Sequence, residues 1–220
     1  MTRPPYAPRV AGAVERSGSR AERRDRATAE TRTAIIAAAR ERLLAEGYAN
    51  LSTRRVAEIA DVPLSQIHYH FGSKLQLILA VLAAETDRLL ERQREMFDKP
   101  EPLWLRWERA CDYLEEDLAS GYVRIQHEMI AAGWSDPEVA ASVRQVVSGW
   151  YRLLGEVVRR EQERGVDLGG LEPDEVAALM GTPFIGAEEL ILLGVTEEEL
   201  PMRSALRKVG AILRRIAEPR

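Results

Sequence analysis

Apolar residues recur at intervals of three and four along this chain from about Thr28 onward, and no stretch needs the period of two that marks a half-buried strand. Gly and Pro are concentrated at the junctions between these periodic segments. Because 45% of the residues are hydrophobic, the chain can bury a sizeable core. The pattern therefore predicts an all-α fold.

The breaks in the pattern divide the chain into nine expected helices. Gly47 is placed to end the first, because glycine accepts a left-handed conformation at little cost, and Ser52 is a suitable N-cap for the second. Asp136, followed by Pro137, has the sequence of a helix start. The expected helices cover residues 28–45, 53–60, 64–70, 74–97, 103–119, 122–132, 137–164, 173–193 and 201–217.

Residues 1–27 differ from the rest because they show no apolar periodicity and hold seven Arg against three acidic residues. Such a segment cannot bury enough surface to offset its chain entropy, so we expect a disordered basic arm without structure before about Thr28. A flexible basic arm can enter the minor groove of DNA. A solvated tail without a partner is the alternative.

The formal net charge of −4 is unevenly distributed along the chain. Residues 1–80 hold 13 Lys and Arg against 8 Asp and Glu, a net +5, whereas residues 81–220 hold 18 against 27, a net −9. This asymmetry favours an N-terminal part that meets a polyanion. Charges clustered on a solvated surface are the alternative.

Several protein classes are excluded by the composition. The longest apolar stretch, residues 75–84, is shorter than the roughly 20 residues of a membrane span, and no secretory signal is recognisable. Cys111 is the single cysteine, and with His68, His70 and His127 it gives no zinc-ligand spacing. We therefore expect a cytoplasmic protein with no membrane, metal or cofactor.

Residues 53–70 have the spacing of a helix-turn-helix. Two short helices cross closely when the contact residue is small, here Ala57, and when the turn residue tolerates positive φ, here Asp61. Val56, Val62 and Ile67 are placed to close the apolar wedge between the helices. Spacing alone leaves a pair of short core helices as the alternative.

The run from Thr31 to Ala83 resembles the DNA-binding domain of the tetracycline-repressor (TetR) family. The resemblance covers roughly a quarter of the chain. His68 stands where the family usually has a tyrosine that touches phosphate, and Ser65 where it often has Gly. The residues that carry the resemblance are Leu51, Ser52, Thr53, Ile59, Ala60, Ile67, His68, Tyr69, His70, Phe71, Gly72, Ser73 and Lys74.

The resemblance implies which side chains meet DNA. Side chains of a recognition helix read base edges in the major groove, while hydroxyls, His and Lys hold phosphates. Arg54 is expected at a base or phosphate, and Ser65 and Gln66 at bases. For His70 a capping or packing role is an equal alternative. The expected phosphate contacts are Thr53, His68, Tyr69, His70 and Lys74.

Aromatic side chains are concentrated between residues 101 and 151, in the acidic part of the chain. Such a cluster can line an apolar small-molecule pocket, although aromatics at helical spacing also fill ordinary cores. The resemblance implies an effector that releases DNA, and leaves its identity open. The candidate ligand-binding residues are Trp104, Trp107, Tyr122, His127, Trp134, Trp150, Tyr151 and Phe184.

The last two expected helices, about 174–193 and 201–217, offer more apolar surface than a helical core needs. They resemble the four-helix dimer interface of the family, which implies a homodimer and a near-palindromic operator. Pro183 is expected to kink or divide the first of the two.

These observations predict a DNA-binding transcriptional regulator, a repressor released by a small-molecule effector. Residues 28–73 form the expected helix-turn-helix domain and residues 74–220 the helical effector-binding and dimerisation domain. A helix-turn-helix activator, or a DNA-binding protein without a ligand, is the alternative. A small helical enzyme is a distant one, because the sequence has no phosphate loop and nothing to orient Cys111 and His127 as a dyad.

Overall fold

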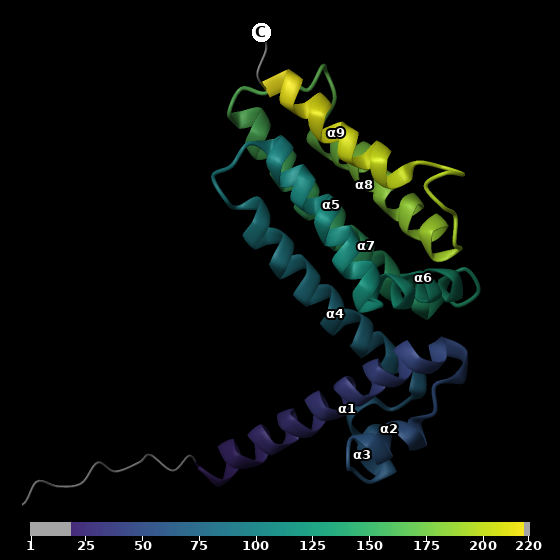
Figure 1. The fold of residues 1–220 in the computed structure, drawn as a ribbon. Coiled ribbons are helices and arrows are strands. Elements are labelled where there is room, and N and C mark those ends of the chain that lie inside the picture. The colour runs from purple at the N-terminus through teal and green to yellow at the C-terminus, as the bar shows by residue number, and fades with distance from the viewer. Residues whose placement is uncertain (1–18, 218–220) are drawn as a thin grey trace, which may run out of the picture.

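The computed structural model describes residues 19–217, and within them it confirms the all-α fold with nine helices and no strand. Figure 1 shows α1 to α3 at one end of the molecule, α4 leading away from them, and α5 to α9 packed together beyond. The helices are α1 (Arg20–Asn50), α2 (Thr53–Ile59), α3 (Leu64–Phe71), α4 (Lys74–Phe97), α5 (Leu103–Ser120), α6 (Tyr122–Gly133), α7 (Pro137–Glu163), α8 (Pro173–Leu192) and α9 (Met202–Ala217).

The prediction of a disordered arm up to residue 27 is wrong for residues 20–27, which form the first turns of α1. Ser19 starts this helix through a capping box: its hydroxyl accepts from the Glu22 amide at 3.2 Å, and the Glu22 carboxylate accepts from the Ser19 amide at 2.6 Å. Alanine, arginine and glutamate then continue it as good helix formers. Residues 1–18 lie outside the described part of the chain.

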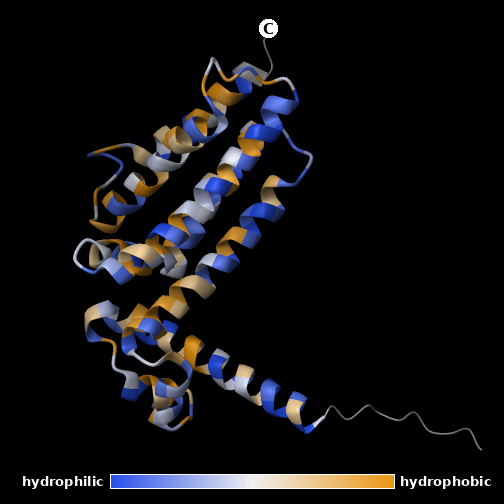
Figure 2. Ribbon diagram, turned by 180° about the vertical axis from the view of Figure 1, so that it is seen from behind, coloured by the Kyte–Doolittle hydropathy of each residue, from blue (hydrophilic) through white to orange (hydrophobic). Residues whose placement is uncertain are grey.

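Residues 20–30 are exposed on every side of α1. This half of the helix projects from the body and is mostly hydrophilic, whereas hydrophobic residues gather where helices meet (Figure 2). Further along α1, Gly47 has a φ of 74°, which interrupts the helix at the predicted position.

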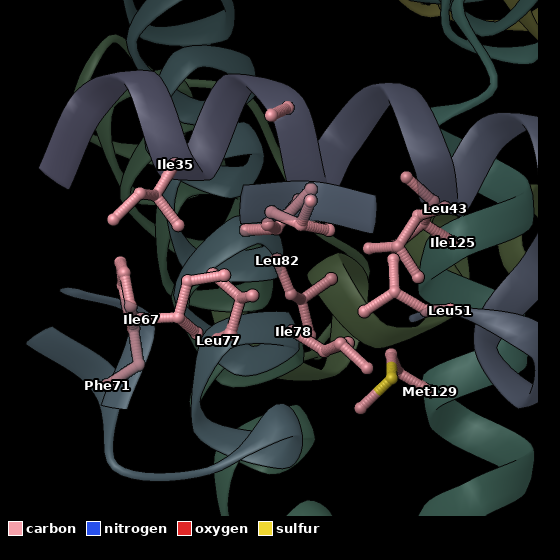
Figure 3. Close-up of a cluster of buried hydrophobic side chains, with 14 of the residues drawn as sticks. Ile35, Leu43, Leu51, Ile67, Phe71, Leu77, Ile78, Leu82, Ile125 and Met129 are labelled. Atoms are coloured by element: carbon pink, nitrogen blue, oxygen red, sulfur yellow. The ribbon is translucent and has the colours of Figure 1, made fainter. Parts of the chain in front are cut away.

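One apolar cluster joins the N-terminal helices to α4 and α6. Figure 3 shows Ile35 and Leu43 of α1, Ile67 and Phe71 of α3, and Leu77, Ile78 and Leu82 of α4 pointing toward one another, with Ile125 and Met129 of α6 alongside. These side chains are all 8% exposed or less. The helix-turn-helix and the first half of α4 are thus packed as one unit.

Two further clusters hold the rest of the bundle. One is shared by α4, α7 and α8, and the other by α5, α8 and α9. Pro183 lies inside α8, which nevertheless continues from Pro173 to Leu192, so the expected division of this helix does not occur. None of the helices in the described range combines the length and apolarity required to cross a bilayer.

Candidate functional site

The turn between α2 and α3 has the geometry that its residues predict. Asp61 is the one non-glycine residue with positive φ, at 52°, in the described part of the chain. The amide of Val62 donates to the carbonyl of Ala57 at 3.0 Å, which closes the turn. Val56, Ala57 and Ile67 are at most 4% exposed and fill the wedge between the two helices.

This packing leaves the polar residues of α2 and α3 on the outside. Arg54, Ser65 and Tyr69 are exposed, and Tyr69 reaches 72% although its side chain is large and aromatic. Thr53 and Gln66 are partly exposed. Five of the eight predicted DNA contacts therefore lie on an open surface around the start of α2 and along α3.

The other three have partners within the protein. The Nδ1 atom of His68 lies 3.4 Å from the carbonyl oxygen of Gly72, at the end of α3. His70 is half-buried, with its ring edge-on to Tyr69 at 5.0 Å. Lys74 donates to the carbonyl of Ala49 at 3.1 Å, which ties the start of α4 to the end of α1.

The helix-turn-helix is connected to the rest of the molecule by α4 and braced by α6. Ser73 caps α4 by accepting from the Gln76 amide at 3.1 Å, directly after the turn that ends α3. Glu128 of α6 accepts from the Tyr48 amide of α1 at 2.7 Å. Arg40 of α1 pairs with the buried Glu85 of α4 at 2.8 Å. Polar contacts thus join α4 and α6 to α1, which packs against the helix-turn-helix.

A cavity lies inside the C-terminal bundle, and part of it is open to solvent. Its walls come from α4, α5, α6, α7 and α8 and are mostly apolar, as is usual for a small-molecule site. The apolar part is lined by Leu89, Leu90, Phe97, Leu103, Ala110, Leu114, Val146, Val147, Leu154, Val157, Val158, Met180 and Ile185.

Four of the eight predicted ligand residues lie on this wall: Trp107, Tyr122, Trp150 and Phe184. The Trp107 indole also donates to the Leu206 carbonyl at 2.7 Å, and the Trp150 indole donates to Gln93 at the same distance. The rings of Trp107 and Trp150 both lie edge-on to Phe184.

The other four candidates do not line this cavity. Trp104 faces α9, where the Arg214 guanidinium lies 4.8 Å from its ring centre. Tyr151 follows Trp150 directly, so it points about 100° away and meets Thr182 at 3.0 Å. His127 and Trp134 line a separate, more open hollow between α6 and α8. Sequence spacing could not select among aromatic faces that pack against different helices.

Comparison with known proteins agrees with both parts of this geometry. Residues 35–81 match the family described as "Bacterial regulatory proteins, tetR family". The chain is 24% identical over 194 residues to the HTH-type transcriptional regulator UidR of Escherichia coli K12, which covers 83% of this chain and 93% of UidR. The matched profile contains the whole helix-turn-helix. Residues 35–81 therefore form a DNA-binding domain of the TetR family.

The chain is a DNA-binding transcriptional regulator. Solved structures show the same fold over both halves. A TetR transcription regulator from Haloarcula marismortui superposes with a TM-score of 0.70, 19% identity, and coverage of 84% of this chain and 96% of that one. FadR from Bacillus subtilis, solved in complex with stearoyl-CoA, superposes with a TM-score of 0.67 and 15% identity. The match covers 82% of this chain and 96% of FadR.

Sequence reasoning missed the polar residues of the regulator's cavity, which are Thr86, Gln93, Asp117, Gln126 and Glu188. A signal for two of them was present. Asp117 follows Ala110 and Leu114 by seven and three positions, and Glu188 follows Phe184 by four, so each shares a helix face with apolar cavity residues.

Two ionisable groups of the bundle are shifted by burial. Burial raises the pKa of Asp117 to about 6, although the paired Arg92 at 2.5 Å opposes the shift. Burial also raises the pKa of the Cys111 thiol to about 11. Because the thiolate is the reactive form, Cys111 is a packing residue of the cluster between α5 and α9.

Proposed function

We propose that this regulator is a homodimeric cytoplasmic repressor that leaves a near-palindromic operator when a small molecule occupies the cavity. Residues 28–73 would read DNA, and residues 74–220 would bind the effector and form the dimer. The proposal gives the chain no catalytic step, no cofactor and no metal.

The course of α4 carries the proposal. Its first turns pack beneath α3, through Leu77 and Ile78, and its later turns line the cavity, through Leu90 and Phe97. An effector that favours one position of these later turns would therefore also favour one position of the recognition helix. Ligand binding by FadR, which has this fold, supports a ligand in the same bundle.

The DNA contacts that we propose follow the exposed surface. Arg54, Ser65 and Gln66 would meet base edges or phosphates, and Thr53 and Tyr69 would hold phosphates. His68 and His70 would add phosphate contacts beside their contacts within the protein, and Lys74 would mainly position α4. The projecting half of α1, with its exposed arginines, would lie along the DNA backbone.

The proposed dimer interface is formed by α8 and α9. Leu179 of α8 is 64% exposed and Ile212 of α9 is 55% exposed, and both are large apolar side chains. Exposed apolar patches of this kind mark association sites. Leu179→Asp with Ile212→Asp should give monomers in analytical ultracentrifugation and weaken operator binding. A dimer that persists in this variant would contradict the interface.

The experiment that tests release begins with selection of an operator from a random DNA pool, followed by a ligand screen against the complex. A ligand should lower operator affinity and raise the melting temperature of the protein. Trp107→Ala or Trp150→Ala should change this response while the affinity without ligand stays within about twofold. If no ligand shifts either quantity, an activator or a binder without effector replaces the proposal. A reporter gene separates repression from activation.

A further inference from the structure

Asp117 of α5 and Glu188 of α8 are the only charged side chains among the described residues that line the cavity. No Lys, Arg or His stands on the same wall. The cavity therefore has an acidic region and a long apolar remainder. An anionic head bound in this cavity would face two carboxylates and would find no cationic partner on the wall.

The hydroxyl of Tyr122 adds a third oxygen to this region, and its hydrogen bonding determines what it can offer. The Thr86 hydroxyl donates its one proton to the Leu82 carbonyl at 2.8 Å. The contact of 3.3 Å between the hydroxyls of Thr86 and Tyr122 must then use the proton of Tyr122. Tyr122 therefore presents only lone pairs, so it acts toward a ligand as an acceptor.

These three side chains line the same cavity. Burial is the main cause that raises the pKa of Tyr122 and that of Asp117, and the charge of Glu188 adds to both shifts. Such mutual repulsion between buried acceptors is relieved by a cation placed between them.

The neighbouring bases stand outside the cavity and cancel only part of its negative charge. Arg92 reaches Asp117 at 2.5 Å but is shared with Glu116 at 3.1 Å. His127 lies 3.2 Å from the Glu188 carboxylate. The acids in this group outnumber the one permanent cation.

Gln93 gives an independent sign that the cavity is made for a polar ligand. Its side chain is on the wall, the residue is only 9% exposed, and its carbonyl oxygen accepts from Trp150. The amide nitrogen of Gln93 has no hydrogen-bond partner among the described residues. This nitrogen is open to the cavity, so it can donate to an acceptor on the body of a ligand, away from its ammonium head.

We propose that the effector is a lipophilic amine, with its protonated nitrogen held by Asp117, Glu188 and the oxygen of Tyr122, and with its apolar body against Trp107, Trp150 and Phe184. The inference rests on the proposed role of the cavity as the effector site. It names the chemical class that this wall selects.

The test uses three probes that share one carbon skeleton and differ in the head: 4-phenylbutylamine, 4-phenylbutanol and 4-phenylbutanoate. The full chain carries Trp104→Phe and Trp134→Phe, so that the remaining tryptophans, Trp107 and Trp150, report from the cavity wall. Fluorescence titration at about pH 7.5 should show the amine binding at least about tenfold more tightly than the alcohol, and the carboxylate more weakly than either.

Variants assign the preference to the two acids. Asp117→Asn with Glu188→Gln should weaken amine binding by at least about tenfold and leave alcohol binding within about twofold. Glu116→Gln is the matched control, because Glu116 pairs with the same Arg92 but does not line the cavity. This control should bind the amine as the parent does. Glu188→Gln alone is a second variant, and it leaves the ion pair between Arg92 and Asp117 intact.

The outcomes separate this inference from the proposed function. If the alcohol or the carboxylate binds as tightly as the amine and weakens operator binding, the amine class is wrong and the effector cavity stands. If none of the three changes the fluorescence or the operator affinity, both proposals fail. Equal loss of amine and alcohol binding in the double variant would show that the acids only support the fold.

Discussion

The helices that form the DNA-reading end and those that form the sensing end bury different kinds of side chain. Beneath α2 and α3 the core is apolar, and the polar side chains point outward. The bundle places polar groups inside instead. Within the described residues the buried polar or charged side chains, all on α4, α5 or α7, are Glu85, Thr86, Gln93, Arg106 and Glu161.

This difference follows from what each region binds. DNA presents a large external surface, so a reading head needs a rigid apolar base and an exposed polar face. A small molecule is enclosed by its site, so the polar groups that recognise it and hold the surrounding helices must be inside. Buried polar groups then need partners, and their removal is expected to be more damaging than that of an apolar group.

The largest expected effect is at Arg106, which is 3% exposed and joins three helices. It donates to the Phe97 carbonyl of α4 at 2.8 Å and to Glu161 of α7 at 2.5 Å. Arg106→Met should lower the free energy of unfolding by about 3–5 kcal/mol in urea denaturation, because Glu161 is left buried with only the exposed end of Arg164 as a partner.

The double variant Arg106→Met with Glu161→Leu is the control for this prediction. Removing both charges should restore part of the lost stability. A double variant less stable than the single one would show that Glu161 is not an uncompensated buried charge in Arg106→Met, and would weaken the distinction between the two regions.

Ile67 tests the apolar base of the reading head. Its side chain is 1% exposed between α3, α1 and α4. Ile67→Ala should cost about 2–4 kcal/mol of unfolding free energy. Ile59→Ala is the matched control, since Ile59 is 43% exposed, and it should change stability by less than about 1 kcal/mol. Equal effects would mean that this core is not tightly packed.

Arg54 and Gln66 test the outer face of the same region. Each alanine substitution should weaken operator binding by about 1–3 kcal/mol, since each removes a contact to a base or a phosphate. Thermal melting should be unchanged, because neither side chain is buried. Gel-shift titration at two salt concentrations also separates phosphate contacts from base contacts. Parental operator binding by both variants would remove the assignment of this face.

The smallest effect is a pH dependence from Asp117. Burial raises its pKa to about 6, whereas the pKa of an Asp in the unfolded chain is about 3.9. The folded state therefore binds this proton more tightly, and stability should fall as pH rises from about 4 to 6, by about 1–2 kcal/mol. Asp117→Asn removes the titrating group. The difference in unfolding free energy between the parent and this variant, measured in urea, should therefore change between about pH 4 and 6. A constant difference would show that Asp117 is not desolvated.

Local patterns predicted much of the reading head. The small Ala57, the positive φ of Asp61 and the break in α1 at Gly47 each depend on neighbours within a few residues, and all three occur where expected. The expected start of the first helix at about Thr28 is wrong because residues 20–27 lack apolar periodicity, whereas the Ser19 hydroxyl and Glu22 start the helix through a capping box.

The cavity could be predicted only in part. The sequence indicated that aromatic residues would gather in the acidic half, and Trp107, Tyr122, Trp150 and Phe184 do line one cavity. It could not show that Trp104 turns to α9 or that Trp134 stays 79% exposed. These outcomes depend on how five helices are rotated about their axes and packed, which no single helix determines.

The sequence by itself determined the helices, the helix-turn-helix and its exposed polar face, because hydrogen bonds and apolar periodicity within short segments decide them. The tertiary structure alone decided that Asp117, Tyr122 and Glu188, from three different helices, meet at one wall of an apolar cavity. Their chemistry as a group comes from burial and mutual proximity, and neither quantity exists until the helices are packed.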